Sequence, residues 1–150
     1  MKIGLVADHR GYKLKEILKL FLQEKGYEIV DLGTNNFDRV DYPLLAESLC
    51  KKINEDEVTC GIAVCGTGIG MSIACNKVKG IFCGKVSSIK EAKLCKEHNN
   101  CNVIALSGTI PSFKAKLIVK KFLKEDFLNE EPYKNRIKQL EQIEKRNKWI

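Results

Sequence analysis

A single cysteine stands where a short apolar run meets a glycine-rich turn. The stretch GIAVCGTGIGMSIACNK, residues 61–77, passes through Cys65 into three closely spaced glycines and then into a helical periodicity. A cysteine between a strand and a helix is either a small core residue or a nucleophile or base held in a favourable field. Cys65 is therefore the first candidate for chemistry in this chain.

The glycines after Cys65 would let the backbone of the turn approach a ligand. Gly66, Gly68 and Gly70 would present N–H groups at a helix N-terminus, and such a nest stabilises an oxyanion or a phosphate. The same groups would favour the thiolate form of Cys65. Glycine-rich turns also serve packing alone, and this turn lacks the last glycine of a dinucleotide fingerprint. The pattern by itself leaves a functional and a structural interpretation open.

Further polar groups lie near the ends of other predicted strands. Asp8 and His9 follow the first strand, and Asn102 lies near the fifth. In an open α/β sheet the ligand binds outside the carboxyl ends of the strands, so we expect these groups to converge with Cys65. Asp8 could instead cap the first helix.

The two histidines of the chain are His9 and His98. A lone histidine is usually structural, but both fall in loops that we predict at strand ends, which favours a functional role. His98 and Asn99 precede the fifth strand. They would need a long loop or a neighbouring subunit to reach the crevice of Cys65.

The elements that must position these residues alternate along the chain. Apolar runs predict strands at residues 2–7, 27–33, 60–65, 80–86 and 102–106. Helical periodicities predict helices that end at Gly26, run from Pro43 to Ile53, end near Asn76, and cover 87–98, 112–127 and 133–147. This alternation is typical of a parallel sheet covered on both faces. The fold class is therefore α/β, a doubly wound three-layer sandwich with a five-stranded parallel sheet and an additional C-terminal helix.

Length and composition favour a single domain spanning residues 1–150. The chain has 44% hydrophobic residues, enough for one well-buried core. Neither a signal-peptide pattern nor a run of about 18 apolar residues is present, so we expect no membrane association and a cytoplasmic location. The last helix, 133–147, has little apolar surface to bury alone. We expect it to pack on a partner subunit or over the site.

Cysteine usage and charge exclude several classes of function. The chain has seven cysteines, an odd number, and no CxxC pair, which argues against a disulfide framework or a zinc site. The net charge of +7 comes from lysines scattered along helical faces, which favours a solvated surface and no nucleic-acid partner. A basic chain would still attract an anionic substrate.

Several motifs, taken in order, resemble one known family. They are DHRGYKLK (8–15), GTNNFDRVDYP (33–43), CGTGIGMSIACNK (65–77), GI (80–81) and EHNNCNVIAL (97–106). This combination resembles the ribose-5-phosphate isomerase B family, which includes the subunits of galactose-6-phosphate isomerase. The resemblance implies an aldose-ketose isomerase that interconverts ribose 5-phosphate and ribulose 5-phosphate through a cis-enediolate, without a metal or an organic cofactor.

The resemblance also implies roles for individual residues. Cys65 would be the base that moves the proton, Thr67 would hydrogen-bond the thiol and help to activate it, and His98 would open the sugar ring. The implied substrate-binding positions are Asp8, His9, Tyr42, Gly66, Gly68, Ile69, Gly70, Asn99 and Arg136. The implied assembly is a homodimer or tetramer with shared active sites, in which His98 and Asn99 enter the pocket of the partner.

The chain departs from the family at three places where arginine is frequent. Those places hold Phe82, Thr109 and Pro132. At least two of those arginines would contact phosphate, so the substrate length and the phosphate-binding groups stay open; Arg10, Arg136 or nearby lysines could compensate. Arg136 could also be a plain charge on a helix surface.

Three alternatives follow. An isomerase of a six-carbon sugar phosphate, such as galactose 6-phosphate, is the main rival. A non-catalytic sugar-phosphate-binding homologue is the second. A cysteine phosphatase would need an arginine six residues after the cysteine to hold phosphate, and that position is Met71.

Overall fold

The strands form one parallel sheet whose order places the first and third strands side by side. The computed structural model describes residues 1–147, and its sheet has the order β2-β1-β3-β5-β4. The strands are β1 (Lys2–Ala7), β2 (Glu28–Asp31), β3 (Cys60–Cys65), β4 (Cys83–Lys85) and β5 (Val103–Ser107). All six residues of β3 are buried, as a central strand covered on both faces requires.

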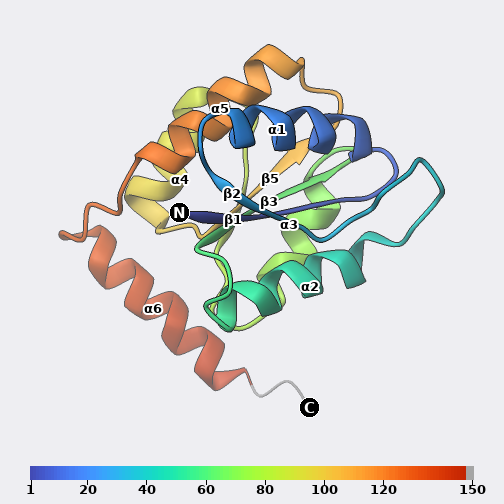
Figure 1. Ribbon diagram of the computed structural model, residues 1–150. Coiled ribbons are helices and arrows are strands. Elements are labelled where there is room, and N and C mark those ends of the chain that lie inside the picture. Colours follow the sequence, from blue (N-terminus) through green and yellow to red (C-terminus); the bar gives the residue numbers. More distant parts are fainter. Residues whose placement is uncertain (148–150) are drawn as a thin grey trace.

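Helices cover both faces of this sheet (Figure 1). Apolar residues of α1 (Tyr12–Glu24), α4 (Ile89–Asn99) and α5 (Ser112–Lys124) join one core cluster. Those of α2 (Tyr42–Asn54) and α3 (Ile69–Asn76) join the cluster on the other face. Helical spacing explains the packing, because Leu14, Leu18 and Leu22 recur every four residues along the buried side of α1. The predicted three-layer α/β sandwich is confirmed.

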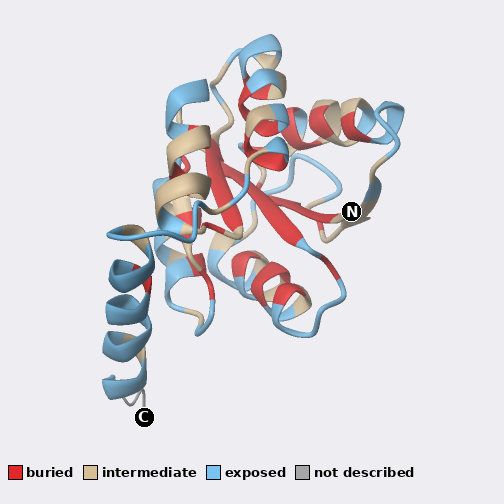
Figure 2. Cartoon of the chain, turned by 90° about the vertical axis from the view of Figure 1, so that its left-hand side faces the viewer, coloured by how far each residue is buried: buried red, intermediate tan, exposed pale blue. Residues whose placement is uncertain are grey.

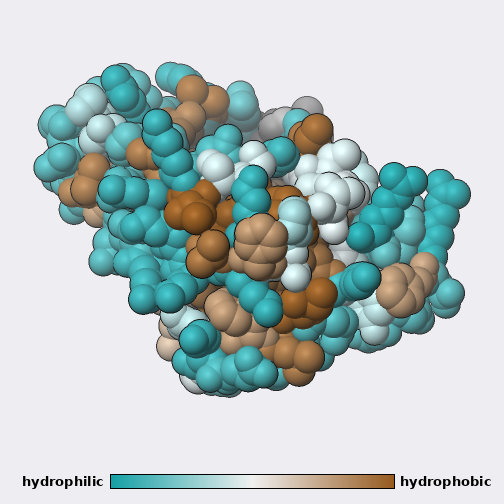
Figure 3. All heavy atoms as spheres, turned by 90° about the horizontal axis from the view of Figure 1, so that it is seen from above, coloured by the Kyte–Doolittle hydropathy of each residue, from teal (hydrophilic) through white to brown (hydrophobic). Residues whose placement is uncertain are grey.

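Burial follows these layers (Figure 2). The central strands are buried, while the outer sides of the helices are exposed. Figure 3 looks onto the layer of α1 and α5, where hydrophilic side chains surround a central group of apolar atoms. Leu20, Phe113 and Leu117 are the large apolar residues exposed on these two helices. Within residues 1–147 no helix is both long enough and apolar enough to span a bilayer.

Two predicted strands are shorter in the structure than the sequence suggested. The strand predicted at 27–33 ends at Asp31, because Gly33 has a φ of +100° and leaves the extended conformation. The strand predicted at 80–86 begins at Cys83, because Gly80 turns with a φ of +81° and the N–H of Ile81 bonds to Val78. The helix predicted at 112–127 ends at Lys124.

The C-terminal helix α6 (Tyr133–Arg146) projects from the three layers (Figure 1). Ile137 is its one buried residue, and Figure 2 shows the rest of the helix largely exposed. Its contacts include α4 and the turn before β4, where the Gly80 N–H donates to Glu144 at 2.9 Å. The helix does not cover the crevice described below.

Candidate active site

A crevice opens where the connections after β1 and β3 leave the sheet in opposite directions. The two strands are paired, with Ala7 opposite Val64. After β1 the chain enters α1 on one face, and after β3 it enters α3 on the other face. Such a switch point is where open α/β sheets bind ligands. A cavity of about 430 Å³ lies there, lined by Asp8, His9, Arg10, Arg39, Tyr42, Cys65, Gly66, Thr67 and Gly70.

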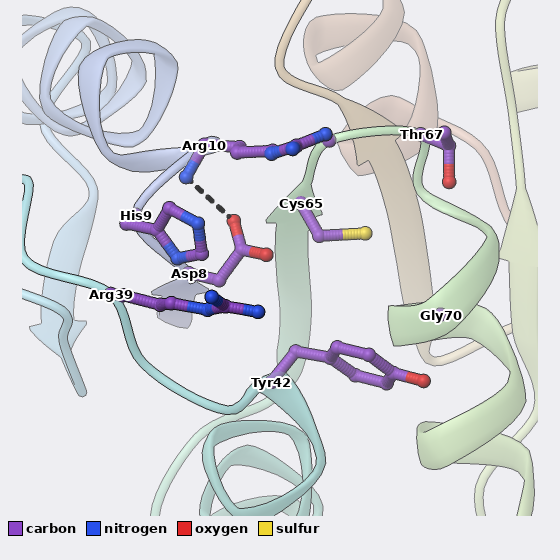
Figure 4. A pocket seen from close by; sticks show the side chains of 9 residues that line it. Asp8, His9, Arg10, Arg39, Tyr42, Cys65, Thr67 and Gly70 are labelled. Atoms are coloured by element: carbon purple, nitrogen blue, oxygen red, sulfur yellow. Dashed lines mark hydrogen bonds between the residues drawn. The ribbon is translucent and has the colours of Figure 1, made fainter.

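Cys65 is the last residue of β3, and its thiol points into this cavity (Figure 4). The residue is 4% exposed. Its sulfur accepts a hydrogen bond from the Gly68 N–H at 3.2 Å, and its carbonyl accepts one from the Gly108 N–H at 2.7 Å. The thiol is therefore held by backbone at the start of α3, where the helix dipole favours negative charge.

The turn after Cys65 needs glycine for two different reasons. Gly68 has a φ of +80°, and a Cβ there would lie 3.0 Å from the backbone carbonyl carbon of Leu106. A Cβ on Gly70 would lie 2.7 Å from the Tyr42 ring, which lines the cavity beside it. One glycine sets the path of the backbone, and the other makes room for an aromatic side chain.

Thr67 and Ile69 are hydrogen-bonded to each other within the turn. The Thr67 hydroxyl accepts a hydrogen bond from the Ile69 N–H at 3.1 Å, while the bond to the thiol comes from Gly68. The Thr67 side chain does line the cavity. Ile69 is 54% exposed, and neither it nor Gly68 is a lining residue.

Asp8 and His9 follow β1 and form the wall opposite the glycine turn. One carboxylate oxygen of Asp8, Oδ1, accepts the N–H groups of Arg10 at 2.9 Å and Gly11 at 3.0 Å. The second oxygen points toward Cys65 in Figure 4. His9 accepts the Val40 N–H on Nδ1 at 3.4 Å, which leaves Nε2 to carry the ring proton of the neutral form. Asp8 thus both ties the turn before α1 and faces the cavity.

Arg39 is a lining residue that sequence reasoning did not single out. It lies in the loop between β2 and α2, four residues before Pro43. Figure 4 shows its guanidinium extending along the cavity wall from one side of His9, with Arg10 on the other side. A charged residue in a long polar loop has no periodicity that could indicate where its side chain points.

His98, Asn99 and Arg136 lie outside this cavity in a single chain. His98 and Asn99 form the last turn of α4, which leads to the amino end of β5, whereas the cavity lies at the carboxyl ends. The His98 ring stacks on Tyr133 with centroids 4.2 Å apart and an interplanar angle of 9°. Arg136 is exposed one turn further along α6. The structure thus collects the expected site residues in two separate places.

The sequence-based predictions for the surroundings of His98 and for Asn102 are wrong. His98 lies within a helix and not in a loop at a strand end. Asn102 precedes β5, and its side chain accepts the Phe82 N–H at 3.0 Å and donates to the Gly80 carbonyl at 3.0 Å. Asn102 therefore ties the start of β4 to β5 and does not converge on Cys65.

Comparison with known proteins identifies the family. A family model described as Ribose/Galactose Isomerase matches residues 3–140. The chain belongs to this family. A probable ribose-5-phosphate isomerase B of Mycoplasma genitalium is 40% identical over 128 residues, which cover 83% of this chain and 84% of that protein. The family membership expected from the motifs is confirmed.

Solved structures of the ribose/galactose isomerase family share the whole fold. Ribose-5-phosphate isomerase B of Clostridium thermocellum superposes with a TM-score of 0.94 at 37% identity, covering 97% of this chain and 99% of that one. The Mycoplasma genitalium ribose-5-phosphate isomerase B with bound ribulose-5-phosphate gives a TM-score of 0.90 at 37% identity, covering 96% of each chain.

The side chains of Phe82, Thr109 and Pro132, where the resemblance led us to expect arginine, are not among those that line the cavity. Phe82 packs against the core, and Pro132 is exposed just before α6. The Ser107 hydroxyl, 2.7 Å from the Gly66 carbonyl, donates its one proton there. The Thr109 hydroxyl, 2.6 Å from Ser107 Oγ, must then donate to Ser107. Thr109 supports the glycine turn through this chain of bonds.

The other six cysteines of this family member are free and buried, as expected from the sequence. Burial raises the pKa of the Cys60 thiol to about 11. Of the seven, Cys65 is the one that lines the cavity. Within residues 1–147 no three His, Cys, Asp or Glu side chains are grouped to hold a metal ion. The expectation of a reaction without metal or cofactor stays a prediction.

Proposed function

We propose that this chain is an aldose-ketose isomerase that interconverts ribose 5-phosphate and ribulose 5-phosphate, with Cys65 as the base. The observation that carries the proposal is the Cys65 sulfur, which faces a cavity at the sheet's switch point while accepting the Gly68 N–H. The family match and the relative with bound ribulose-5-phosphate support the substrate class.

The proposed reaction moves one proton between neighbouring carbons. The Cys65 thiolate takes the proton from C2 of the open-chain aldose, and the electron pair of the C–H bond forms a C1–C2 double bond while the C1 carbonyl oxygen becomes anionic. The resulting cis-enediolate receives the proton from the thiol on C1. O1 gains a proton and O2 loses one, which gives the ketose without any net oxidation.

The surroundings of Cys65 suit this chemistry. Negative charge on the sulfur would be stabilised by the Gly68 N–H and by the amino end of α3. Gly70 exposes backbone to the cavity in the first turn of the same helix, where N–H groups could hold the enediolate oxygen. The cavity-facing oxygen of Asp8 is positioned for sugar hydroxyls, and Thr67 can donate its hydroxyl proton to the substrate.

We further propose that the active site is shared between subunits of a homodimer or tetramer. His98, Asn99 and Arg136 cannot serve the cavity of their own chain from the opposite edge of the sheet. They lie near one another at the exposed junction of α4 and α6, where a partner's cavity could receive them. In that arrangement His98 would open the ring of the cyclic substrate.

The first experiment tests the base. Cys65→Ala should abolish the exchange of the substrate C2 proton with solvent, because no other group would take that proton, while substrate binding changes only a few-fold. Cys60→Ala is the matched control, because Cys60 is equally buried but does not line the cavity. Normal turnover by Cys65→Ala would show that Cys65 is not the base.

A second observation favours a test on longer substrates. An adjoining cavity of about 440 Å³ shares Asp8, His9, Arg39 and Tyr42 with the first, which leaves room beyond a pentose. Isomerisation should be measured on ribose 5-phosphate and galactose 6-phosphate with a chelator present throughout. We expect higher kcat/KM on the pentose and no effect of the chelator. Binding of both without turnover would instead indicate a non-catalytic homologue.

A further inference from the structure

Two arginines of one chain flank the substrate cavity. We propose that Arg10 and Arg39 together bind the phosphate group of the substrate. The proposal rests on the function proposed above, because it assigns the phosphate end of the same substrate. It places both phosphate-binding groups on the chain that supplies Cys65.

The backbone of Arg10 is fixed by close packing. Its N–H donates to the buried carboxylate of Asp8 at 2.9 Å. A Cβ built on Gly108 would lie 2.4 Å from the Arg10 carbonyl oxygen, and one built on Gly11 would lie 2.4 Å from the Val64 carbonyl oxygen. Three segments therefore meet at Arg10 with no room for side chains between them, so the residue has little freedom to shift.

The side chain of Arg10 runs directly over the glycine turn. A Cβ on Gly66 would lie 3.0 Å from Arg10 Cδ and 3.6 Å from Nη1. The stem of the Arg10 side chain therefore lies close against the backbone at Gly66. In Figure 4 the guanidinium reaches across the cavity mouth toward Thr67, above the Cys65 thiol.

Arg39 approaches from the opposite side on a loop that is tied to the site. The next residue, Val40, donates its N–H to His9 Nδ1 at 3.4 Å. The start of the same loop is held by Asp31, which accepts the Gly33 N–H at 3.0 Å. The two guanidinium groups therefore lie on either side of His9 and both line the cavity (Figure 4).

The charged side chains on this side of the cavity favour the binding of a dianion. Within residues 1–147 neither Arg10 nor Arg39 forms an ion pair, whereas lysines on nearby helices are paired with carboxylates. Asp8 is the one carboxylate among the lining residues, and its Oδ1 is occupied by backbone N–H groups. A phosphate monoester carries a charge of about −1.5 to −2 at pH 7 and accepts paired N–H donors from arginine.

The test compares Arg10→Met and Arg39→Met with Arg146→Met, an arginine exposed at the end of α6. Each cavity variant should raise the KM for ribose 5-phosphate by about tenfold to a hundredfold, the range for a lost hydrogen bond to a charged group, with kcat changed much less. Inhibition by inorganic phosphate should weaken by a similar factor. The loss of kcat/KM on ribose, which has no phosphate, should be much smaller than the loss on ribose 5-phosphate in both cavity variants.

Two further variants keep the test decisive if a methionine variant folds poorly. Arg10→Lys and Arg39→Lys retain the charge but lose the paired donors, so their KM values should lie between those of the wild type and the methionine variants. An unchanged KM, unchanged inhibition by inorganic phosphate, or an equal loss on ribose would each overturn the proposal.

A failure of the arginine proposal can be distinguished from a failure of the proposed isomerase function. If the wild-type protein turns over no sugar phosphate, the isomerase proposal fails. Calorimetric titration with inorganic phosphate then still compares the wild type with the two cavity variants. Weaker phosphate binding in both, but not in Arg146→Met, would support the arginine pair independently, and equal binding in all of them would refute it.

Discussion

The reactivity proposed for Cys65 depends on the conformation of one residue three positions later. Gly68 turns with a φ of +80°, and this turn directs its N–H to the sulfur at 3.2 Å. An L-amino acid with a side chain rarely adopts that conformation. The hydrogen bond to the thiol and the entry into α3 are therefore set by the same glycine.

Gly68→Ala should lower both stability and activity. The left-handed backbone costs about 1–2 kcal/mol for a residue with a Cβ, and the crowding against Leu106 adds to it. The N–H would also turn away from Cys65, so kcat should fall well beyond the loss of folded protein. Urea unfolding and kcat for ribose 5-phosphate measure the two effects separately.

Gly26→Ala is the matched control for that prediction. Gly26 has a φ of +86°, but a Cβ there would meet nothing within 4 Å, and the residue is remote from the cavity. It should lose similar stability from the backbone strain while keeping its kcat. Equal kcat in the two variants would show that the Gly68 N–H is unimportant to the thiol.

At the scale of elements, a buried charge network holds the loop that carries Arg39. Lys15 on α1 is fully buried and contacts Asp31 Oδ1 at 2.6 Å at the end of β2, while Lys19 contacts Oδ2 at 2.9 Å. Burial alone would raise the pKa of Asp31. The hydrogen bonds from Lys15, Lys19 and the Gly33 N–H outweigh it and hold that pKa below its ordinary value.

Asp31→Asn should destabilise the protein in a pH-dependent way. At pH 7 we expect a loss of about 3 kcal/mol, the low end for a broken buried pair because Glu16 still contacts Lys15 at 3.0 Å. Since the folded pKa of Asp31 is lowered, its contribution is complete above about pH 4, near its ordinary pKa. The contribution disappears as the pH falls through the folded value.

Urea unfolding of both proteins between pH 7 and pH 2 measures this difference. The gap between the wild type and Asp31→Asn should narrow steadily below pH 4. Glu57→Gln, in the exposed pair with Lys52, serves as a control and should change stability little at any pH. A gap that stays constant down to pH 2 would exclude ionised Asp31 as its source.

The elements themselves could be predicted because each has its own period. The buried run of β3 and the four-residue spacing of Leu14, Leu18 and Leu22 identify a strand and a helix directly. The ends of β2 and β4 could not be predicted, because they depend on the turns of Gly33 and Gly80. The side-chain direction of Arg39 depends on tertiary contacts of its loop, which leave no trace in the local sequence.

At the scale of the whole molecule, the expected site residues are divided between the two opposite ends of the strands. The cavity lies at the carboxyl ends of β1 and β3, and His98 lies at the end of α4, before the amino end of β5. The order of the motifs along the chain suggested which residues belong to the site. Their separation in space follows from the parallel sheet, which puts the carboxyl and amino ends of its strands on opposite sides. Active sites shared between subunits would bring the two groups of residues together, because a two-fold axis can place the carboxyl ends of the strands of one chain beside α4 and α6 of its partner.

Mixing two inactive variants tests this sharing. Cys65→Ala lacks the base and His98→Asn lacks the ring-opening group, so each homodimer should turn over cyclic ribose 5-phosphate poorly. In a mixed dimer one site would combine Cys65 of one chain with His98 of the other and would be intact. After subunit exchange at equal concentrations, activity should recover to about one quarter of the wild-type value, because half of the dimers carry one intact site of two.

Mixing Cys65→Ala with a Cys65→Ala/His98→Asn double variant provides the control and should recover nothing. If the first mixture also stays inactive after exchange is verified by mass spectrometry, the two residues act within one chain. Normal activity of the His98→Asn homodimer alone would show that His98 has no part in the reaction.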